Sequence, residues 1–259
     1  MIILASDHAG FLLKEEIKKY TQSLSIPCYQ TDFRSMLSPG CFMELAQECC
    51  EPHSRLLGIG HDELIQFRVV WVLTRMHFRF HKPIFWRDIV SMTTWHKGLE
   101  AAQYQRDFVL KNQAGELLAD ATSSWVMINI DTREFVRRSP IECDDTVCKE
   151  NAIEKPCERL RVPRDIDSEY AYTHRIAFSD LDKNVHTNNA KYLLWSMNAI
   201  PEEVTMHRLV KEVKINFNHE TRLNEMIALR RYRLDANAWM IEGLKEDGVS
   251  AFVSRIEFE

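Results

Sequence analysis

The segment SDLDKNVHTNN, residues 179–189, concentrates polar side chains that could do chemistry. Asp182, Asn184 and His186 are spaced two residues apart, and an apolar stretch, AKYLLWSM, follows them. Asp, Asn and Thr are common helix N-caps, so a purely structural explanation of these polar residues is that they cap the helix that follows. A helix start also offers N–H groups to a developing oxyanion, while a carboxylate and an imidazole can move protons. The segment therefore predicts an acyl-transfer site at the beginning of a helix. Glu220, at a strand end, is a further candidate acid; the alternative is a solvent-exposed carboxylate without a catalytic role.

The flanking residues indicate the elements that would hold this segment. An apolar face formed by Phe42, Leu45, Ala46 and Cys49 predicts a helix over 39–57, and NNAKYLLWSM predicts a second. Alternating patterns predict strands after each helix: RMHFRFH, AAQYQRDFVLK and ELLADATSSWVMINI in the first half, and EVKINFNHE, IALRRYRL, AWMIEGL and VSAFVSRIEF in the second. NQAG, DAN and EDG are the expected turns. Each half is thus predicted to be one helix followed by an antiparallel sheet.

The two halves also align with each other. Residues 31–49 match residues 179–197 at an offset of 148, which sets Asp32 against Asp180. A second match, at an offset of 137, sets Phe78 and Phe80 against Ile215 and Phe217. We interpret the pattern as an internal duplication. In this alignment Asp182, Asn184, His186 and Glu220 fall opposite Arg34, Met36, Ser38 and Pro83, which favours a chemical role for the second copy alone.

Composition limits the function classes. The 259 residues are 45% hydrophobic and 27% charged, as in proteins that bury a sizeable core. The net charge of −5 gives no overall attraction to nucleic acid or anionic membranes, and no apolar run is long enough to span a bilayer. Seven cysteines without a Cys-x-x-Cys pair indicate free thiols in a reducing compartment. We therefore expect a cytoplasmic protein with no metal, no membrane association and no nucleic-acid partner.

These motifs resemble the acyl-ACP thioesterases of plants and bacteria. The family pattern Asp-Leu-Asp-x-Asn-x-His-Val-Asn-Asn is met by residues 180–189, with Thr187 in place of the usual Val. The strand pattern Trp-Val-x-Thr-Arg-Met is met by residues 71–76, and FWRDIVSMTTW and SSWVMIN follow as further blocks in the right order. The resemblance extends over about residues 23–259.

The resemblance implies a fold and a site. The fold would be α+β, a tandem (double) hotdog in which a long helix is wrapped by an antiparallel sheet in each half. An N-terminal hotdog at 23–138 would hold the acyl chain, and a Pro-rich, charged linker at 139–165 would lead to a catalytic hotdog at 166–259. The implied catalytic residues are Asp182, Asn184, His186 and Glu220. The expected substrate-binding residues are Trp71, Thr74, Arg75, Phe42, Ala46 and Trp125, with core packing as the alternative role of the tryptophans.

Thr221 departs from the family pattern, because the plant enzymes have Cys after the acid. A thiolate nucleophile is therefore excluded at this position. Either water activated by a base or a carboxylate remains as the attacking group, and the sequence does not decide between the carboxylates.

Residues 1–22 are expected to be an extra segment. MIILASDHAGFLLKEEIKKY resembles the opening of ribose-5-phosphate isomerase B, in which a strand leads into Ser-Asp-His-Ala-Gly. That isomerase needs a complete α/β domain, a Gly-rich phosphate loop and a Cys farther on, and none of these follows here. We therefore expect a fused fragment or a mis-set start, without isomerase activity.

The resemblance implies hydrolysis of fatty acyl-ACP to free fatty acid and ACP in fatty acid biosynthesis, without a cofactor. The partners would be acyl carrier protein and a fatty acyl thioester, and a homodimer is an open option. Two alternatives remain: an acyl-CoA thioesterase, and a non-catalytic protein that binds acyl chains or the carrier. Because the carrier is acidic and this chain is net negative, docking needs a local basic patch. The candidates are Arg137, Arg138, Arg159, Arg161 and Arg164, with a solvated linker as the alternative explanation.

Overall fold

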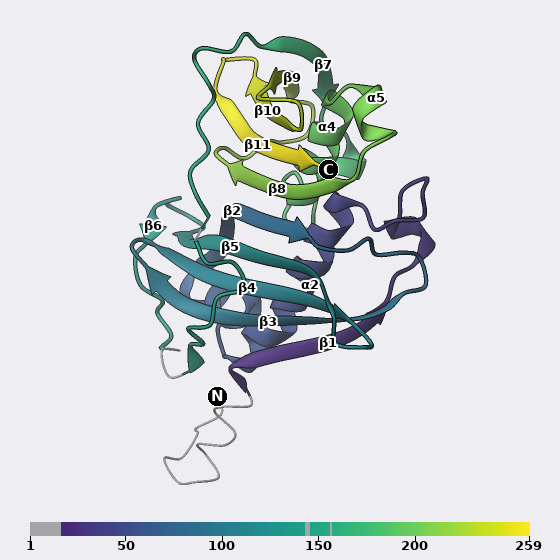
Figure 1. Cartoon of the computed structure of the whole chain (residues 1–259). Coiled ribbons are helices and arrows are strands. Elements are labelled where there is room, and N and C mark those ends of the chain that lie inside the picture. Colours follow the sequence, from purple (N-terminus) through teal and green to yellow (C-terminus); the bar gives the residue numbers. More distant parts are fainter. Residues whose placement is uncertain (1–16, 143–145, 156) are drawn as a thin grey trace, which may run out of the picture. The chain divides into compact units, whose positions relative to one another are not determined.

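The strands of the described residues are hydrogen-bonded into one antiparallel sheet of 11 strands, and two main helices pack against it (Figure 1). A computed structural model describes residues 17–142, 146–155 and 157–259. They divide into two compact units, the first from residues 17–37, 44–74 and 81–155, and the second from residues 38–43, 75–80 and 157–259. Residues 1–16, which carry most of the isomerase-like segment, lie outside the described residues.

The first unit has strands in the order β1-β3-β4-β5-β2, with β6 beside β5. Their bounds are β1 Lys19–Ser25, β2 Val69–Phe80, β3 Ile89–Glu100, β4 Gln103–Asn112, β5 Leu117–Asn129 and β6 Phe135–Val136. Helix α2, Pro39–Leu56, lies against this sheet, where the Cys49 thiol contacts the Met92 carbonyl of β3. The short elements are η1 Cys28–Gln30, α3 His61–Leu64 and η2 Ile65–Phe67.

The second unit repeats this arrangement with the order β8-β11-β10-β9-β7. Its elements are β7 Glu169–Arg175, η4 Phe178–Asp180, α4 Asn189–Ala199, α5 Glu202–Thr205, β8 Val210–Phe217, β9 Met226–Arg233, β10 Ala238–Lys245 and β11 Ser250–Phe258. Residues 75–79 of β2 pair with β8 within this unit. Helix α4 buries Tyr192, Leu193 and Trp195, and Tyr192 packs against Phe217 and Phe252 of the sheet.

Local sequence explains why the two main helices start and stop where they do. The Ser38 hydroxyl accepts a hydrogen bond from the Cys41 N–H at the start of α2, and Pro39 supplies the fixed φ suited to a first turn. The chain leaves the helix at Gly58, whose φ of +71° is a left-handed conformation that glycine adopts without strain. Asn188 caps α4 by accepting from the Ala190 N–H. The predicted helices are therefore confirmed.

The predicted strands and turns after each helix are also confirmed. Gly115 and Gly248 have φ of +81° and +80° in the turns NQAG and EDG, and Asp235 accepts two N–H groups in the turn DAN. His77 departs from the expected alternation. It is buried although it follows Met76, because its imidazole bonds to the Glu212 carboxylate at 2.7 Å.

The structure confirms the duplication and corrects its alignment. The 137-residue offset holds, because the Asp88 and Glu225 carboxylates accept from the amides of Phe85 and Arg222 in equivalent turns. The helical match was wrong by two residues: η1 and η4, and likewise β1 and β7, are related by 150 residues rather than 148. The error arose because Asp180 and Asp182 are both available to match Asp32, and residue types alone do not show which one forms the turn.

The structure also gives contacts to two predicted connecting segments. The extra segment expected at 1–22 overlaps β1, whose residues from Lys19 onward pair with β3. This strand escaped prediction because it alternates between exposed and half-buried positions and has few apolar side chains. Within the predicted linker at 139–165, Cys148, Ile153 and Cys157 are buried, and the Trp95 indole donates to the Glu150 carbonyl. The domain boundaries themselves stay a prediction.

Candidate active site

Asp182 shapes the loop that carries the other polar residues. One carboxylate oxygen accepts the backbone N–H groups of Asn184 at 2.8 Å and of His186 at 3.2 Å, while the Asp182 N–H donates to the His186 carbonyl at 2.8 Å. Between them Val185 adopts a φ of +62°, an unfavourable conformation for a β-branched residue, which this ring of bonds holds in place. The loop therefore fixes the direction in which residue 186 leaves the backbone.

The first unit contains the same loop without the same chemistry. Asp32 accepts the N–H groups of Arg34 at 2.8 Å and of Met36 at 3.1 Å, and the intervening residue has a φ of +59°. Asp182 thus corresponds to Asp32, and not to Arg34 as the sequence alignment suggested. A backbone role of the aspartate is common to both copies, whereas His186 stands opposite Met36.

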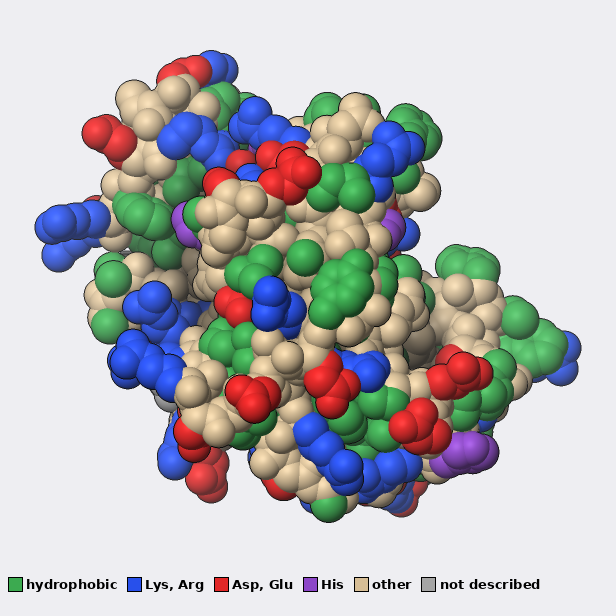
Figure 2. Space-filling model, turned by 90° about the horizontal axis from the view of Figure 1, so that it is seen from above, with side chains coloured by type: hydrophobic (Ala, Val, Ile, Leu, Met, Phe, Trp, Pro, Cys, Tyr) green, Lys and Arg blue, Asp and Glu red, His purple; other side chains and the backbone are tan. Residues whose placement is uncertain are grey.

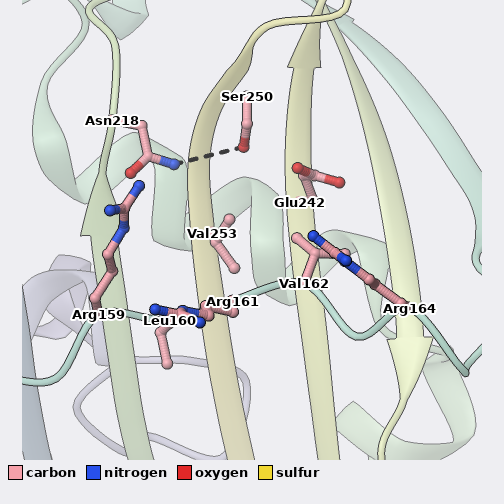
Figure 3. A pocket seen from close by; sticks show the side chains of 9 residues that line it. All are labelled: Arg159, Leu160, Arg161, Val162, Arg164, Asn218, Glu242, Ser250 and Val253. Carbon is pink, nitrogen blue, oxygen red and sulfur yellow. Dashed lines mark hydrogen bonds between the residues drawn. The ribbon is translucent and has the colours of Figure 1, made fainter.

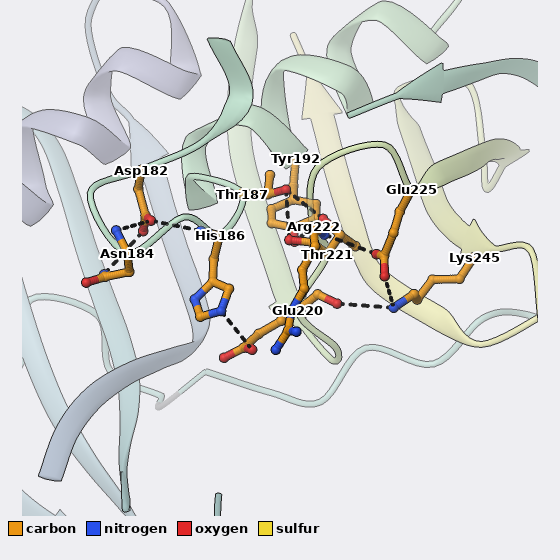
Figure 4. A network of polar contacts seen from close by, with 10 residues as sticks. All are labelled: Asp182, Asn184, His186, Thr187, Tyr192, Glu220, Thr221, Arg222, Glu225 and Lys245. Carbon is orange, nitrogen blue, oxygen red and sulfur yellow. Dashed lines mark hydrogen bonds and ion pairs between the residues drawn. The ribbon is translucent and has the colours of Figure 1, made fainter. Parts of the chain in front are cut away.

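His186 and Glu220 face each other across two segments of the second unit (Figure 4). The Nε2 atom of His186 lies 3.6 Å from a carboxylate oxygen of Glu220, and both side chains are about one-third exposed, at 30% and 33%. His186 comes from the loop before α4, and Glu220 from the segment after β8. An imidazole and a carboxylate at this distance, open to solvent, can share protons with a water molecule and with a bound substrate.

A buried hydroxyl network holds those two segments together. The Thr187 N–H donates to the Thr221 carbonyl at 3.2 Å, and the two threonine hydroxyls bond to each other at 2.7 Å. The Tyr192 hydroxyl also bonds to the Thr221 hydroxyl, at 2.8 Å. Thr187 and Thr221 are the chain neighbours of His186 and Glu220, so the network sets their separation. Sequence reasoning missed this network, although its signal was present: these are the two positions that depart from the family's usual Val and Cys.

The backbone donors expected to bind an oxyanion are already engaged, and that expectation was wrong for them. The amides of Asn184 and His186 serve Asp182, the amide of Asn188 donates to the Asp180 carbonyl, and the amide of Ala190 donates to the N-cap side chain. The Asn184 side chain is a further donor, and it makes only a long hydrogen bond to the Asp182 carboxylate. Its amide nitrogen lies 3.5 Å from Asp182, and it points away from Glu220 in Figure 4.

The structure gives the expected substrate-binding residues mostly packing roles. Trp71 and Trp125 pack on one cluster around Leu64, Val69, Tyr104 and Met127. Thr74 donates to the Ser124 carbonyl, and Arg75 donates to the Cys157 carbonyl. Phe42 and Ala46 are fully buried on α2, where Phe42 contacts the rings of Phe78 and Phe80. Their role in binding a substrate stays a prediction.

The same face of α2 becomes polar farther along. His53 is fully buried and accepts at Nδ1 from the Arg106 guanidinium, at 2.7 Å, while its Nε2 bonds to the Ile17 carbonyl. Burial, with the neighbouring Arg106 charge, lowers the pKa of His53 to about 4. Burial raises the pKa of the Cys49 thiol to about 12, which leaves it without nucleophilic character. The apolar stripe from Phe42 to Cys49 thus ends at a fixed positive charge.

Comparison with known proteins places the chain in a family. A model of the acyl-ACP thioesterase N-terminal domain matches residues 17–143, and a model of the C-terminal domain matches residues 164–247. The chain belongs to the acyl-ACP thioesterase family. It is 26% identical over 236 residues to oleoyl-acyl carrier protein thioesterase 2, chloroplastic, of Arabidopsis thaliana, covering 83% of this chain and 63% of that protein. It therefore spans somewhat less than two thirds of the length of this curated relative.

Solved structures of family members share the fold. An acyl-ACP thioesterase from Bacteroides thetaiotaomicron aligns with a TM-score of 0.87 at 22% identity, over 95% of this chain and 99% of that one. The 12:0-ACP thioesterase from Umbellularia californica aligns with a TM-score of 0.80 at 20% identity, over 93% and 97%. The expected α+β tandem hotdog is thereby confirmed.

Proposed function

We propose that this acyl-ACP thioesterase family member hydrolyses fatty acyl-ACP to free fatty acid and ACP, in the cytoplasm. The observation that carries the proposal is the His186–Glu220 pair at 3.6 Å, which occurs in the copy that also carries the family's polar motif. The six described cysteines are all free thiols, in keeping with a reducing compartment. Among the described residues, none of the helices combines the length and hydrophobicity needed to cross a membrane. No described cluster of three or more His, Cys, Asp or Glu side chains is placed to hold a metal ion.

In the proposed mechanism a water molecule is the nucleophile. The pair of His186 and Glu220 accepts a proton as the water oxygen bonds to the thioester carbon, and the carbonyl oxygen becomes an oxyanion. Because the backbone donors of the loop are engaged, we assign that oxyanion to the Asn184 side-chain amide, which must turn from Asp182 toward the His186–Glu220 pair to donate to it. When the C–S bond breaks, the pair returns the proton to the leaving sulfur. Asp182 positions the loop and with it both Asn184 and His186.

Purified protein tests the proposal directly. His186→Ala and Glu220→Gln should each lower kcat for acyl-ACP by ~10²–10⁴, the usual effect of losing an acid–base group. The matched controls are Met36→Ala and Pro83→Ala, which change the equivalent positions of the first copy and should leave kcat unchanged. Parent-like hydrolysis by both His186 and Glu220 variants would refute the assignment.

A substrate panel separates the proposed activity from its alternatives. The same acyl groups, over a range of chain lengths, are offered on ACP and on CoA. A preference for CoA would make the protein an acyl-CoA thioesterase. Binding of acyl-ACP without any turnover would instead identify a non-catalytic carrier binder. Whether the protein forms a homodimer is open to a sedimentation measurement.

A further inference from the structure

A basic groove lies on the second unit, separate from the His186–Glu220 pair (Figure 3). Its volume is about 670 Å³, within the range of ligand-binding clefts. The lining residues come from the segment before β7 and from the β8, β10 and β11 region of the sheet. They are Arg159, Leu160, Arg161, Val162, Arg164, Asn218, Glu242, Ser250 and Val253.

The arginines of this groove stand on a backbone that is fixed to the sheet. Leu160 and Val162 pack on a buried cluster of Tyr232, Met240 and Val253. The Leu160 N–H donates to the Asn216 side chain at 2.7 Å, and the Asn216 amide donates back to the Glu158 carbonyl at 3.3 Å. The alternation of apolar and basic residues in RLRV therefore places the apolar side chains against the sheet and the arginines outward.

The charge of the groove is predominantly positive, with three arginines and one carboxylate in its lining. Arg159, Arg161 and Arg164 are exposed, and within the described residues no carboxylate lies at ion-pair distance from any of them. The single lining carboxylate, Glu242, accepts a hydrogen bond from the Tyr232 hydroxyl. Figure 2 shows basic and acidic side chains interspersed over the face that it draws. In a protein of net charge −5, three arginines without an ion pair to any described residue thus surround one groove.

The groove and the candidate catalytic carboxylate share one strand end. Asn218 lines the groove, and Glu220 follows two residues later. The N–H groups of Asn218 and His219 both donate to the Ala251 carbonyl, at 2.8 and 3.0 Å, which ties this segment to the start of β11 beside Ser250. A partner held in the groove is therefore bound next to the segment that presents Glu220.

We propose that this groove docks the acidic protein surface of the acyl carrier protein during hydrolysis, an inference that rests on the proposed function. Charge complementarity speeds encounter and fixes orientation more than it adds affinity, so the arginines should act on the capture of the carrier and leave the chemical step alone. Arg137 and Arg138 carry the same charge outside the groove and take no part in docking.

The test compares a triple variant, Arg159→Ala, Arg161→Ala and Arg164→Ala, with the parent on three substrates that carry one acyl group. We expect kcat/KM for acyl-ACP to fall ~10–100-fold, mainly through KM, because electrostatic steering raises association rates by 10–10³. Hydrolysis of the acyl-N-acetylcysteamine thioester and of acyl-CoA should stay within about twofold of the parent, because neither substrate carries the protein. The matched control is Arg137→Ala with Arg138→Ala, which should leave all three substrates unchanged.

The outcomes separate the docking proposal from the catalytic one. Unchanged kcat/KM for acyl-ACP in the triple variant overturns the docking site, and an equal loss on acyl-CoA overturns it in favour of a phosphate site. If the triple variant is also slow on the N-acetylcysteamine thioester, the alanine substitutions disturb the enzyme itself, and a triple Arg→Lys variant is tested in its place. This variant keeps the positive charge, so a loss of its activity on acyl-ACP overturns the proposal. A parent KM for acyl-ACP that does not rise between about 50 mM and about 500 mM salt overturns it as well. Failure of the parent to hydrolyse any of the three substrates would refute the catalytic function itself.

Discussion

Replacing Asp182 by Asn separates the backbone role of this residue from its part in catalysis. The substitution keeps an oxygen that can accept from the amides of Asn184 and His186, at the present 2.8 and 3.2 Å, but removes the negative charge. The first unit supplies a matched control, because Asp32→Asn changes the same turn where Met36 stands in place of His186.

The expected loss of stability follows from the hydrogen bonds. A bond to a charged group contributes about 1.5–3 kcal/mol and a neutral one about 0.5–1.5 kcal/mol, so two bonds lose at most about 2–3 kcal/mol. Partial exposure of Asp182 reduces this to about 1 kcal/mol in the free energy of unfolding. Asp32→Asn should cost at least as much, because Asp32 also pairs with the Arg34 guanidinium at 2.8 Å. Each variant should lower Tm by about 2–4 °C in circular dichroism.

Activity should distinguish the two variants. We expect Asp182→Asn to lower kcat for acyl-ACP by at least ~10-fold, because a loosened loop misplaces Asn184 and His186, and even small errors in position are costly in catalysis. Asp32→Asn should leave kcat unchanged while its Tm falls. Parent-like turnover by Asp182→Asn would show that the residue only closes a turn. An equal fall of activity in both variants would mean that stability alone explains the loss.

Three further perturbations test the reasoning elsewhere. Thr221→Val removes the hydroxyl contacts to Thr187 and Tyr192 at a fully buried position, so kcat should fall and the free energy of unfolding should drop by about 1–3 kcal/mol. If the double variant Thr187→Val, Thr221→Val restores kcat and stability, the contact between the two threonines is confirmed. If Thr221→Val changes neither kcat nor stability, the contact is contradicted. Burial lowers the pKa of His53 to about 4 and that of His96 to about 3, so the unfolded state binds more protons than the folded state below about pH 6.5. Denaturant melts should therefore show the free energy of unfolding falling as the pH drops from about 6.5 toward 4. If the free energy of unfolding of His96→Gln depends on pH as steeply as that of the parent, His96 is not a cause of the pH dependence. Lys97→Met removes the ammonium group that lies 3.4 Å from the buried Asp107 carboxylate and should lower the free energy of unfolding in urea by about 3–5 kcal/mol. The surface control Lys111→Met should lower it by less than about 0.5 kcal/mol. Similar losses in the two variants would argue against a buried ion pair.

The helices, hairpins and family of this chain could be predicted because their signals are local. The apolar face of α2 repeats with helical spacing, and glycines mark the turns that need a positive φ. The edge strands β1 and β7 were missed because hydrogen bonds to β3 and β9 hold them in place, whereas a repeating apolar pattern is weak or missing. The contacts of the segment at 139–165 could likewise not be predicted, because its partners lie far away in the sequence. The Cys148 N–H donates to the His96 carbonyl, and the Ala152 N–H donates to the Asp107 carboxylate.

The candidate site shows the same division between local and distant information. The loop from Asp182 to His186 could be recognised as a motif, and His186 and Glu220 could be selected from residue types. The aspartate that both copies share could not be identified without the turn geometry, because the sequence offered two aspartates for one partner. The engagement of the Thr187 N–H was also unpredictable, because its acceptor, the Thr221 carbonyl, comes from another strand end.

The geometry explains how one duplicated frame can carry chemistry in a single copy. In the first unit the Leu37 N–H donates to the Ile84 carbonyl at 2.8 Å, and in the second unit the Thr187 N–H donates to the Thr221 carbonyl at 3.2 Å. This bond brings together the residues that precede its two ends, whatever their side chains are. In the first copy those positions hold Met36 and Pro83, which cannot transfer protons. In the second copy they hold His186 and Glu220. Because the same backbone hydrogen bond is present in both copies, these two side chains are sufficient to create the pair.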